Sequence, residues 1–163
     1  CSKTYSMTGW RIGYTAGDST IIKAMSKLQG QSTSCPNSIA QYAAVEALIG
    51  KQKIVSEMVE IFKNRRELII KGLNAIDNIV CNKPKGAFYA FPNISYFLNK
   101  TYNGTIIKSA HDLSMLLLKE KFIATVSGDS FGSPSNIRFS YATSEDIINK
   151  MLERLKAVLS LIK

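Results

Sequence analysis

Three side chains in this sequence combine a residue type and a setting that could support chemistry: Lys3, Arg11 and Arg138. A lysine amine can form a Schiff base with a carbonyl, and a guanidinium can hold a phosphate or carboxylate through two parallel hydrogen bonds. Lys3 and Arg11 are eight residues apart, and Gly9 and Trp10 directly precede the arginine. Such a spacing is by itself a weak signal, because lysine and arginine pairs recur by chance in a basic chain.

The complete string from Ser2 to Tyr14, S-K-T-Y-S-M-T-G-W-R-I-G-Y, is a far more specific signal. It resembles the lysine motif of class I pyridoxal-phosphate aminotransferases, most closely that of the bacterial aspartate aminotransferase type. A second string, I-R-F-S-Y-A from Ile137 to Ala142, resembles another motif of this family. The resemblance continues through the rest of the chain. It implies that the sequence begins where a family member would be more than half finished.

The resemblance implies roles for four residues. Lys3 would carry pyridoxal 5'-phosphate as a Schiff base and then move the substrate proton, which requires a lowered lysine pKa. Arg11 would grip the cofactor phosphate, Ser2 could touch that phosphate, and Arg138 would bind the substrate α-carboxylate. The alternatives are a solvated surface lysine for Lys3 and an arginine paired with carbonyls or a carboxylate for Arg11. For Arg138 the alternative is a solvent-exposed strand arginine.

The resemblance also implies that the active site is incomplete. A family member needs an aspartate on the pyridine nitrogen, a tyrosine and an asparagine beside the cofactor, and a helix N-terminus for its phosphate. All of these precede the lysine in family order, whereas only Cys1 and Ser2 precede Lys3 here. We therefore expect this segment to be inactive alone.

The elements that must position these residues are predicted from hydrophobic periodicity and turn residues. Residues 10–16 read as a short buried strand, with glycines that mark close backbone approach, and two helices follow up to residue 49. An uninterrupted helical pattern covers residues 51–76. Further strands are predicted at 87–91, 122–126 and 137–141, an irregular loop at 94–107, and helices after Ser109 and Thr143.

The predicted fold is therefore α/β. By resemblance it is the C-terminal part of a fold-type I pyridoxal-phosphate-dependent transferase. Residues 1–50 would be the remnant of the large cofactor-binding domain, 51–78 a long connecting helix, and 79–163 a small two-layer domain with about three strands. A lone strand in the first fifty residues would leave its hydrogen-bonding edges unpaired.

Composition restricts the remaining possibilities. The formal net charge of +9 invites a nucleic-acid-binding interpretation, but the lysines are scattered and no aromatic residues interleave with a basic cluster. No apolar run is long enough to span a bilayer. Three cysteines without framework spacing read as reduced thiols in the cytoplasm. His111 is the only histidine, and no metal-ligand cluster is expected.

The sequence thus predicts a portion of a cytoplasmic, homodimeric aminotransferase that moves amino groups between an amino acid, aspartate by family resemblance, and a 2-oxo acid. No nucleic acid or membrane partner and no metal are expected. Two alternatives stay open. One is another amino-acid aminotransferase or a lyase on the same fold, and the other is a non-enzymatic basic module that binds nucleic acid.

Overall fold

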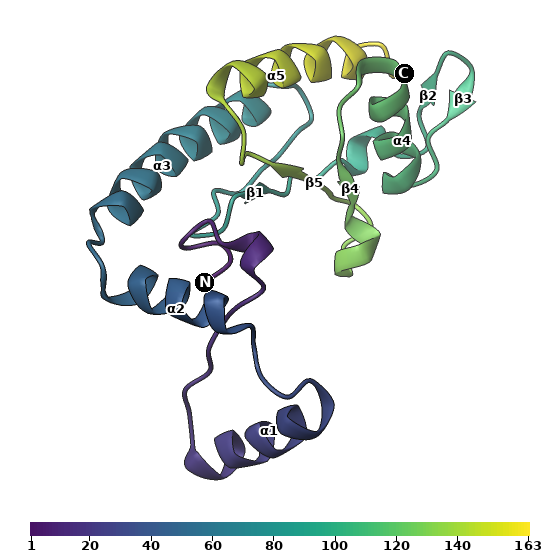
Figure 1. The fold of residues 1–163 in the computed structure, drawn as a ribbon. Coiled ribbons are helices and arrows are strands. Elements are labelled where there is room, and N and C mark those ends of the chain that lie inside the picture. The colour runs from purple at the N-terminus through teal and green to yellow at the C-terminus, as the bar shows by residue number, and fades with distance from the viewer. The chain divides into compact units, whose positions relative to one another are not determined.

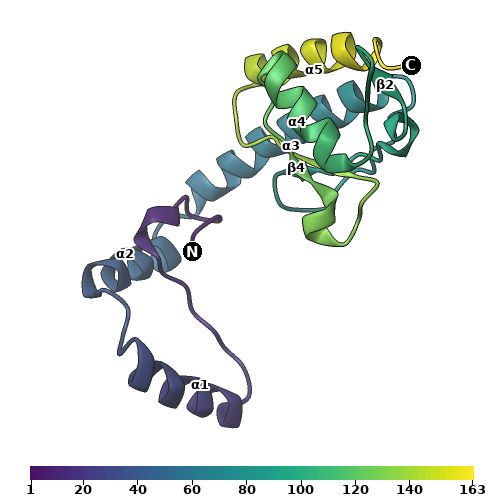
Figure 2. The same cartoon turned by 90° about the vertical axis from the view of Figure 1, so that its right-hand side faces the viewer.

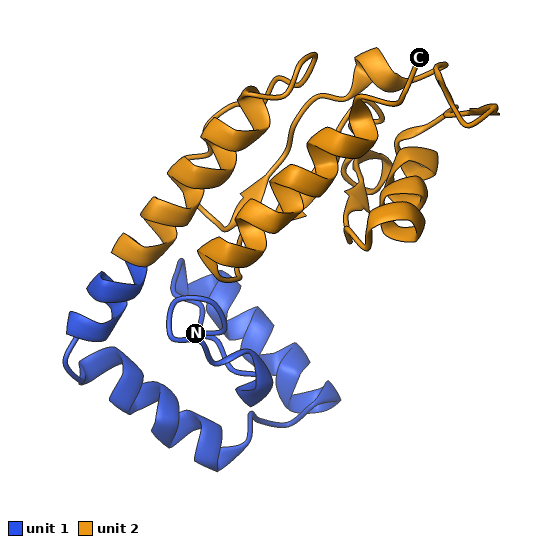
Figure 3. Cartoon of the chain, turned by 90° about the horizontal axis from the view of Figure 1, so that it is seen from above, with its two compact units in different colours: residues 1–59 blue, residues 60–163 orange.

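A computed structural model describes residues 1–163 as five α-helices and five short strands, with three 3-10 turns between them (Figure 1). The chain divides into two compact units, residues 1–59 and residues 60–163 (Figure 3). All of the strands belong to the second unit.

The first unit is helical. Side chains of Asp18 and Asn37 cap its first two α-helices by accepting hydrogen bonds from the backbone N–H groups of Thr20 (2.8 Å) and Ala40 (3.1 Å). Such caps satisfy N–H groups that have no partner inside the helix. The elements of this unit are the 3-10 turn η1 (Thr8–Trp10), α1 (Ser19–Ser32), α2 (Ser38–Ile49) and the beginning of α3 (Lys53–Asn74).

The strand predicted for residues 10–16 is wrong. Its first residue closes η1, and residues 12–18 have no regular secondary structure. A strand needs a neighbouring strand for its backbone hydrogen bonds, and the first unit contains none. The predicted close approach is also not made within these residues, because a Cβ atom on Gly9, Gly13 or Gly17 would meet nothing within 4 Å.

The long helix predicted over residues 51–76 is present as α3, Lys53–Asn74. The boundary between the two compact units falls inside it, after residue 59. The assignment of residues 1–50, 51–78 and 79–163 to a large domain, a connecting helix and a small domain stays a prediction.

A three-stranded antiparallel sheet organises the second unit, with the order β1-β5-β4 (Figure 1). Tyr89 lies opposite Ser140, and Val126 lies opposite Arg138. A separate hairpin and the 3-10 turn η2 occupy the segment 94–107, which was predicted to be irregular. The bounds are β1 (Tyr89–Ala90), η2 (Ser95–Phe97), β2 (Thr101–Tyr102), β3 (Thr105–Ile106), β4 (Val126–Ser127) and β5 (Ile137–Ser140).

Two capped helices and the end of α3 complete the second unit. α4 (Ala110–Lys121) begins after Ser109, whose hydroxyl accepts from the N–H of Asp112 (3.1 Å), as its sequence predicted. α5 (Glu145–Leu159) begins after Ser144, packs against α4 (Figure 2), and meets α3 where Gly72 lies against Leu152. The 3-10 turn η3 (Gly128–Phe131) connects β4 to the segment before β5.

The second unit contains one hydrophobic core, which confirms the predicted α/β architecture. Helices and sheet contribute to it together, because residues of α3, α4 and α5 and alternate residues of β5 are all buried. No helix combines the length and apolarity that a membrane span requires. The largest core side chains include Ile69, Leu73, Ile94, Ile107, Leu113, Leu117, Ile137, Phe139, Tyr141, Ile148 and Leu155.

Candidate active site

The segment that contains Ser2 and Lys3 is a tight turn whose two ends are joined by a backbone hydrogen bond. The Tyr5 N–H donates to the Cys1 carbonyl (3.1 Å), and residues 2–5 form consecutive turns. Tyr5 donates its phenol to Gln52 Oε1 (3.4 Å), just before α3 begins, and the Ser6 hydroxyl contacts Met58 Sδ (3.5 Å). The start of α3 therefore holds this turn in place within the first unit.

Lys3 is exposed and Ser2 is partly exposed on this turn. Met7 follows and is buried, so the chain turns inward directly after the polar residues. An amine and a hydroxyl are thus presented side by side in sequence, on backbone whose conformation is fixed by the neighbouring contacts.

Arg11 lies at the end of η1 with a left-handed backbone conformation (φ 52°). One of its guanidinium nitrogens, Nη1, donates to the Thr8 carbonyl at 3.0 Å. This arginine forms no ion pair with any carboxylate of the chain. A guanidinium has five N–H donors, so most of the Arg11 donors remain for an external anion.

A cavity of about 340 Å³ lies under the same turn, between the end of α2 and the start of α3. Tyr5, Met7 and Met58 are among its lining residues, whereas Ser2, Lys3 and Arg11 are not. This cavity is therefore a separate feature from the predicted cofactor-binding residues.

Arg138 occupies the middle of the second unit's sheet. Its neighbours Ile137 and Phe139 in β5 are buried, and Arg138 itself is half-buried on the opposite face. Its guanidinium carbon Cζ lies 4.3 Å from the ring centre of Tyr89 and 4.4 Å from that of Phe131. No carboxylate of the chain pairs with it. An unpaired guanidinium between aromatic rings is chemically suited to bind a carboxylate ligand.

The two rings around Arg138 were not predicted to belong to the site. Tyr89 belongs to the string G-A-F-Y and Phe131 to the loop S-G-D-S-F-G. No local pattern in either string indicates a contact with Arg138. Their convergence on one arginine depends on the pairing of β1 with β5 and on the conformation of η3.

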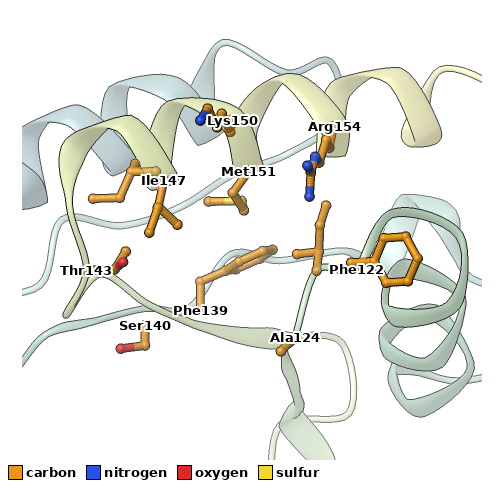
Figure 4. A pocket seen from close by; sticks show the side chains of 11 residues that line it. Phe122, Ala124, Phe139, Ser140, Thr143, Ile147, Lys150, Met151 and Arg154 are labelled. Carbon is orange, nitrogen blue, oxygen red and sulfur yellow. The ribbon is translucent and has the colours of Figure 1, made fainter.

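A pocket of about 330 Å³ is lined by residues of α5, of β5 and of the segment 122–124 (Figure 4). Figure 4 shows Met151 of α5 above Phe139, with the Arg154 side chain descending from the helix toward the pocket. Arg138 is not among its lining residues. The pocket is therefore separate from the candidate carboxylate-binding arginine.

Ser2, Lys3 and Arg11 belong to the first compact unit, and Arg138 belongs to the second. His111 is exposed in the first turn of α4, and no group of three or more His, Cys, Asp or Glu side chains could hold a metal ion. Cys81 is buried, and this burial raises the pKa of its thiol, which makes it a poor nucleophile.

Comparison with known proteins gives a consistent result. A sequence model of the family described as "Aminotransferase class I and II" matches residues 1–155. The aspartate aminotransferase of Rhizobium meliloti (strain 1021) is 48% identical over 157 residues, which cover 96% of this chain and 38% of that protein. The aspartate aminotransferase of Bacillus subtilis (strain 168) is 46% identical over 155 residues, covering 95% of this chain and 38% of that protein.

Solved structures show the same similarity. The crystal structure of the Rhizobium meliloti aspartate aminotransferase has a TM-score of 0.93 at 45% identity and covers 99% of this chain and 41% of that chain. An aromatic aminotransferase from Pyrococcus horikoshii OT3 has a TM-score of 0.85 at 39% identity, covering 97% of this chain and 41% of that chain. The chain thus spans about two fifths of the length of the relatives that it matches.

Proposed function

Because this chain belongs to the class I and II aminotransferases, a family that depends on pyridoxal phosphate, we propose that it is the portion of an aspartate-aminotransferase-like enzyme that contains the cofactor-binding lysine. The observation that supports this most directly is the uninterrupted string from Ser2 to Tyr14 inside the matched region. It places an amine, a hydroxyl and a guanidinium on one short segment.

The donor set on this segment fits the cofactor chemically. Pyridoxal phosphate carries an aldehyde and a phosphate dianion, and when bound it supplies an electron sink for charge that develops on the substrate α-carbon. Lys3 would hold the cofactor through its aldehyde carbon, and the aldehyde oxygen would leave as water. Arg11, whose donors meet only one backbone carbonyl in the chain, would hold the phosphate through charge-assisted hydrogen bonds, with Ser2 as an additional donor.

Lys3 would also act on the proton of the substrate α-carbon. An amine can accept a proton only in its neutral form, so the complete site must favour neutral lysine.

Arg138 would bind the α-carboxylate of the amino acid and of the 2-oxo acid. Two parallel N–H···O bonds would fix the orientation of the substrate, which determines whether the bond to the α-hydrogen is aligned for abstraction. The unpaired state of this guanidinium supports the role, since no internal carboxylate competes with the ligand.

Aspartate is the amino donor that we propose, because relatives at 45–48% identity bear that name. The second candidate is an aminotransferase of other amino acids. It is favoured by relatives named aspartate/prephenate aminotransferase and by the similarity to an aromatic aminotransferase structure. Amino-donor profiling of the longer protein distinguishes the two: preference for an aromatic donor over aspartate would exclude our first assignment.

The longer protein is proposed to be a cytoplasmic homodimer. All three cysteines of the chain are free, which agrees with a reducing compartment. We further propose that the 163-residue chain is inactive alone, because its residues supply the lysine, the phosphate-binding arginine and the carboxylate-binding arginine but no partner for the pyridine nitrogen.

Borohydride trapping tests the assignment without relying on activity. The 163-residue chain is incubated with pyridoxal phosphate, reduced and digested, and the modified lysine is located by peptide mass. We expect preferential labelling of Lys3, lost in Lys3→Ala, weakened in Arg11→Ala, and unchanged in Lys23→Ala, which removes an exposed lysine of the same unit. Labelling that is equal at all surface lysines and unchanged in Arg11→Ala would overturn the proposal. Robust transamination by the 163-residue chain would overturn the proposed inactivity.

A further inference from the structure

The guanidinium of Arg138 lies between two aromatic rings that do not touch one another. Tyr89 and Phe131 have their ring centres 4.3 Å and 4.4 Å from its Cζ, and no ring contact joins the two. Both distances are well inside the range of about 6 Å over which a cation is attracted to an aromatic face. Arg138 is therefore held from two sides before any ligand is present.

Each ring is itself held by another aromatic residue. The Tyr89 ring centre lies 4.6 Å from that of Phe88, and Phe131 meets Phe91 edge-on at 6.0 Å. Tyr89 belongs to β1, which pairs with the same strand that carries Arg138. The spacing between these side chains is thus fixed by a sheet register on one side and by aromatic packing on both.

The turn that carries Phe131 is tied to the segment just before β5. The Gly128 N–H donates to the Asn136 carbonyl (2.8 Å), and the Ser133 N–H donates to the Gly128 carbonyl (2.9 Å). Asn136 in turn donates its side-chain amide to the Phe91 carbonyl (3.0 Å). These bonds connect the supports of Phe131 to the strand of Arg138, so that ring and guanidinium are positioned together.

We propose that Tyr89 and Phe131 are positioning residues that orient Arg138 for the substrate carboxylate, an inference that rests on the carboxylate-binding role proposed above. The Arg138 guanidinium forms no ion pair within the chain, so its N–H donors remain available to a carboxylate while the two ring contacts restrain the side chain. Holding the side chain in one orientation beforehand lowers the entropy lost on binding. A positioning role should therefore affect both the affinity for a carboxylate and the order of the Arg138 side chain in the free protein.

The first measurement is the order of the Arg138 side chain in the free 163-residue chain, from ¹⁵N relaxation of its Nε–Hε group. Tyr89→Leu and Phe131→Leu should each raise its mobility, while Tyr89→Phe and Phe131→Tyr, which keep an aromatic face, should not. Tyr96→Leu is the matched control, since Tyr96 contacts Lys100 in the same kind of cation–aromatic pair (4.1 Å) and does not contact Arg138.

The second measurement is the affinity of the same variants for succinate, a plain carboxylate probe. Arg138→Lys is the reference variant, because it keeps the positive charge but removes the paired guanidinium donors. We expect about five-fold weaker binding for each leucine variant and unchanged binding for the aromatic and control variants. Unfolding midpoints in urea confirm that each variant is folded.

The outcomes separate the two proposals. Leucine variants that leave both the order of Arg138 and the succinate affinity unchanged would overturn the positioning role while the carboxylate role survives. Succinate binding that is absent, or that ignores Arg138→Lys, would overturn both, whereas the assignment of Lys3 is judged independently by borohydride trapping.

Discussion

The two compact units bury very different amounts of apolar surface. The second unit closes a hydrophobic core that includes residues of three helices and a sheet. In the first unit only Met7, Ala40 and Ala44 are buried hydrophobic residues. α2 has apolar residues on all of its sides, yet only its Ala40 and Ala44 are buried. α1 buries no residue at all. The difference is in packing partners, since both units contain well-capped helices.

This contrast shows that a segment can form regular secondary structure without forming a hydrophobic core of its own. Caps and helix propensity suffice to define α1 and α2, but most helical stability in proteins comes from burying an apolar face. A helix that is hydrophobic all round is typical of an element buried on every side. The exposed apolar residues of α2 are therefore typical of a helix that packs against further parts of a protein. This supports the proposal that residues 1–50 are part of a larger domain.

The largest expected effect that would test this contrast comes from truncating one side chain at each end of α3. Leu73 is 0% exposed in the second unit, and Ile54 is 71% exposed in the first. Leu73→Ala should lower the free energy of unfolding by about 2–5 kcal/mol, whereas Ile54→Ala should leave it nearly unchanged. Urea unfolding followed by circular dichroism measures both. Equal losses would show that the two units share one core.

A smaller effect is expected from adding a methyl group to one glycine in each unit. A Cβ on Gly128 would collide with the backbone carbonyls of Ser133 and Asn136, so Gly128→Ala should destabilise the second unit by about 1–3 kcal/mol. A Cβ on Gly30 in α1 would meet nothing within 4 Å, and Gly30→Ala should increase helix content, with a gain of up to about 1 kcal/mol. Thermal unfolding compares the two. A stabilising Gly128→Ala would contradict the tight loop.

The smallest effect concerns a single hydroxyl. Tyr141 is buried and donates to the Ala87 carbonyl at 3.0 Å, so Tyr141→Phe should cost about 0.5–1.5 kcal/mol. Tyr42 of α2 is 81% exposed, and Tyr42→Phe should change nothing measurable. Urea midpoints at neutral pH give both values, and a cost for Tyr42→Phe equal to that of Tyr141→Phe would contradict the contrast.

Tyr141 also makes the stability of the second unit depend on pH. Burial raises the pKa of Tyr141, and the nearby Arg66 guanidinium opposes this only in part. A raised pKa means that the folded state retains its proton longer than the unfolded chain does. The associated stability is therefore fully present below about pH 10 and falls as the pH rises above it. Tyr141→Phe should flatten this dependence, and a slope that is unchanged in the variant would assign it to another group.

Much of the helical structure followed from local sequence. The cap at Ser109, the cap at Ser144 and the long helix α3 were all predictable, because capping and helical periodicity are decided by residues within a few positions of one another. The strand predicted at 10–16 failed, and the hairpin of β2 and β3 was missed, because a strand exists only with its partner.

The sequence by itself identified the family and the residues whose side chains could take part in the chemistry. The string around Lys3 and Arg11 and the string around Arg138 are local patterns, and their residue types do not depend on distant contacts. Only the tertiary structure decided that Tyr89 and Phe131 meet Arg138 and that α2, the apolar helix of the first unit, leaves most of its large apolar side chains exposed. Both results depend on contacts between residues far apart in the chain, which no local pattern specifies.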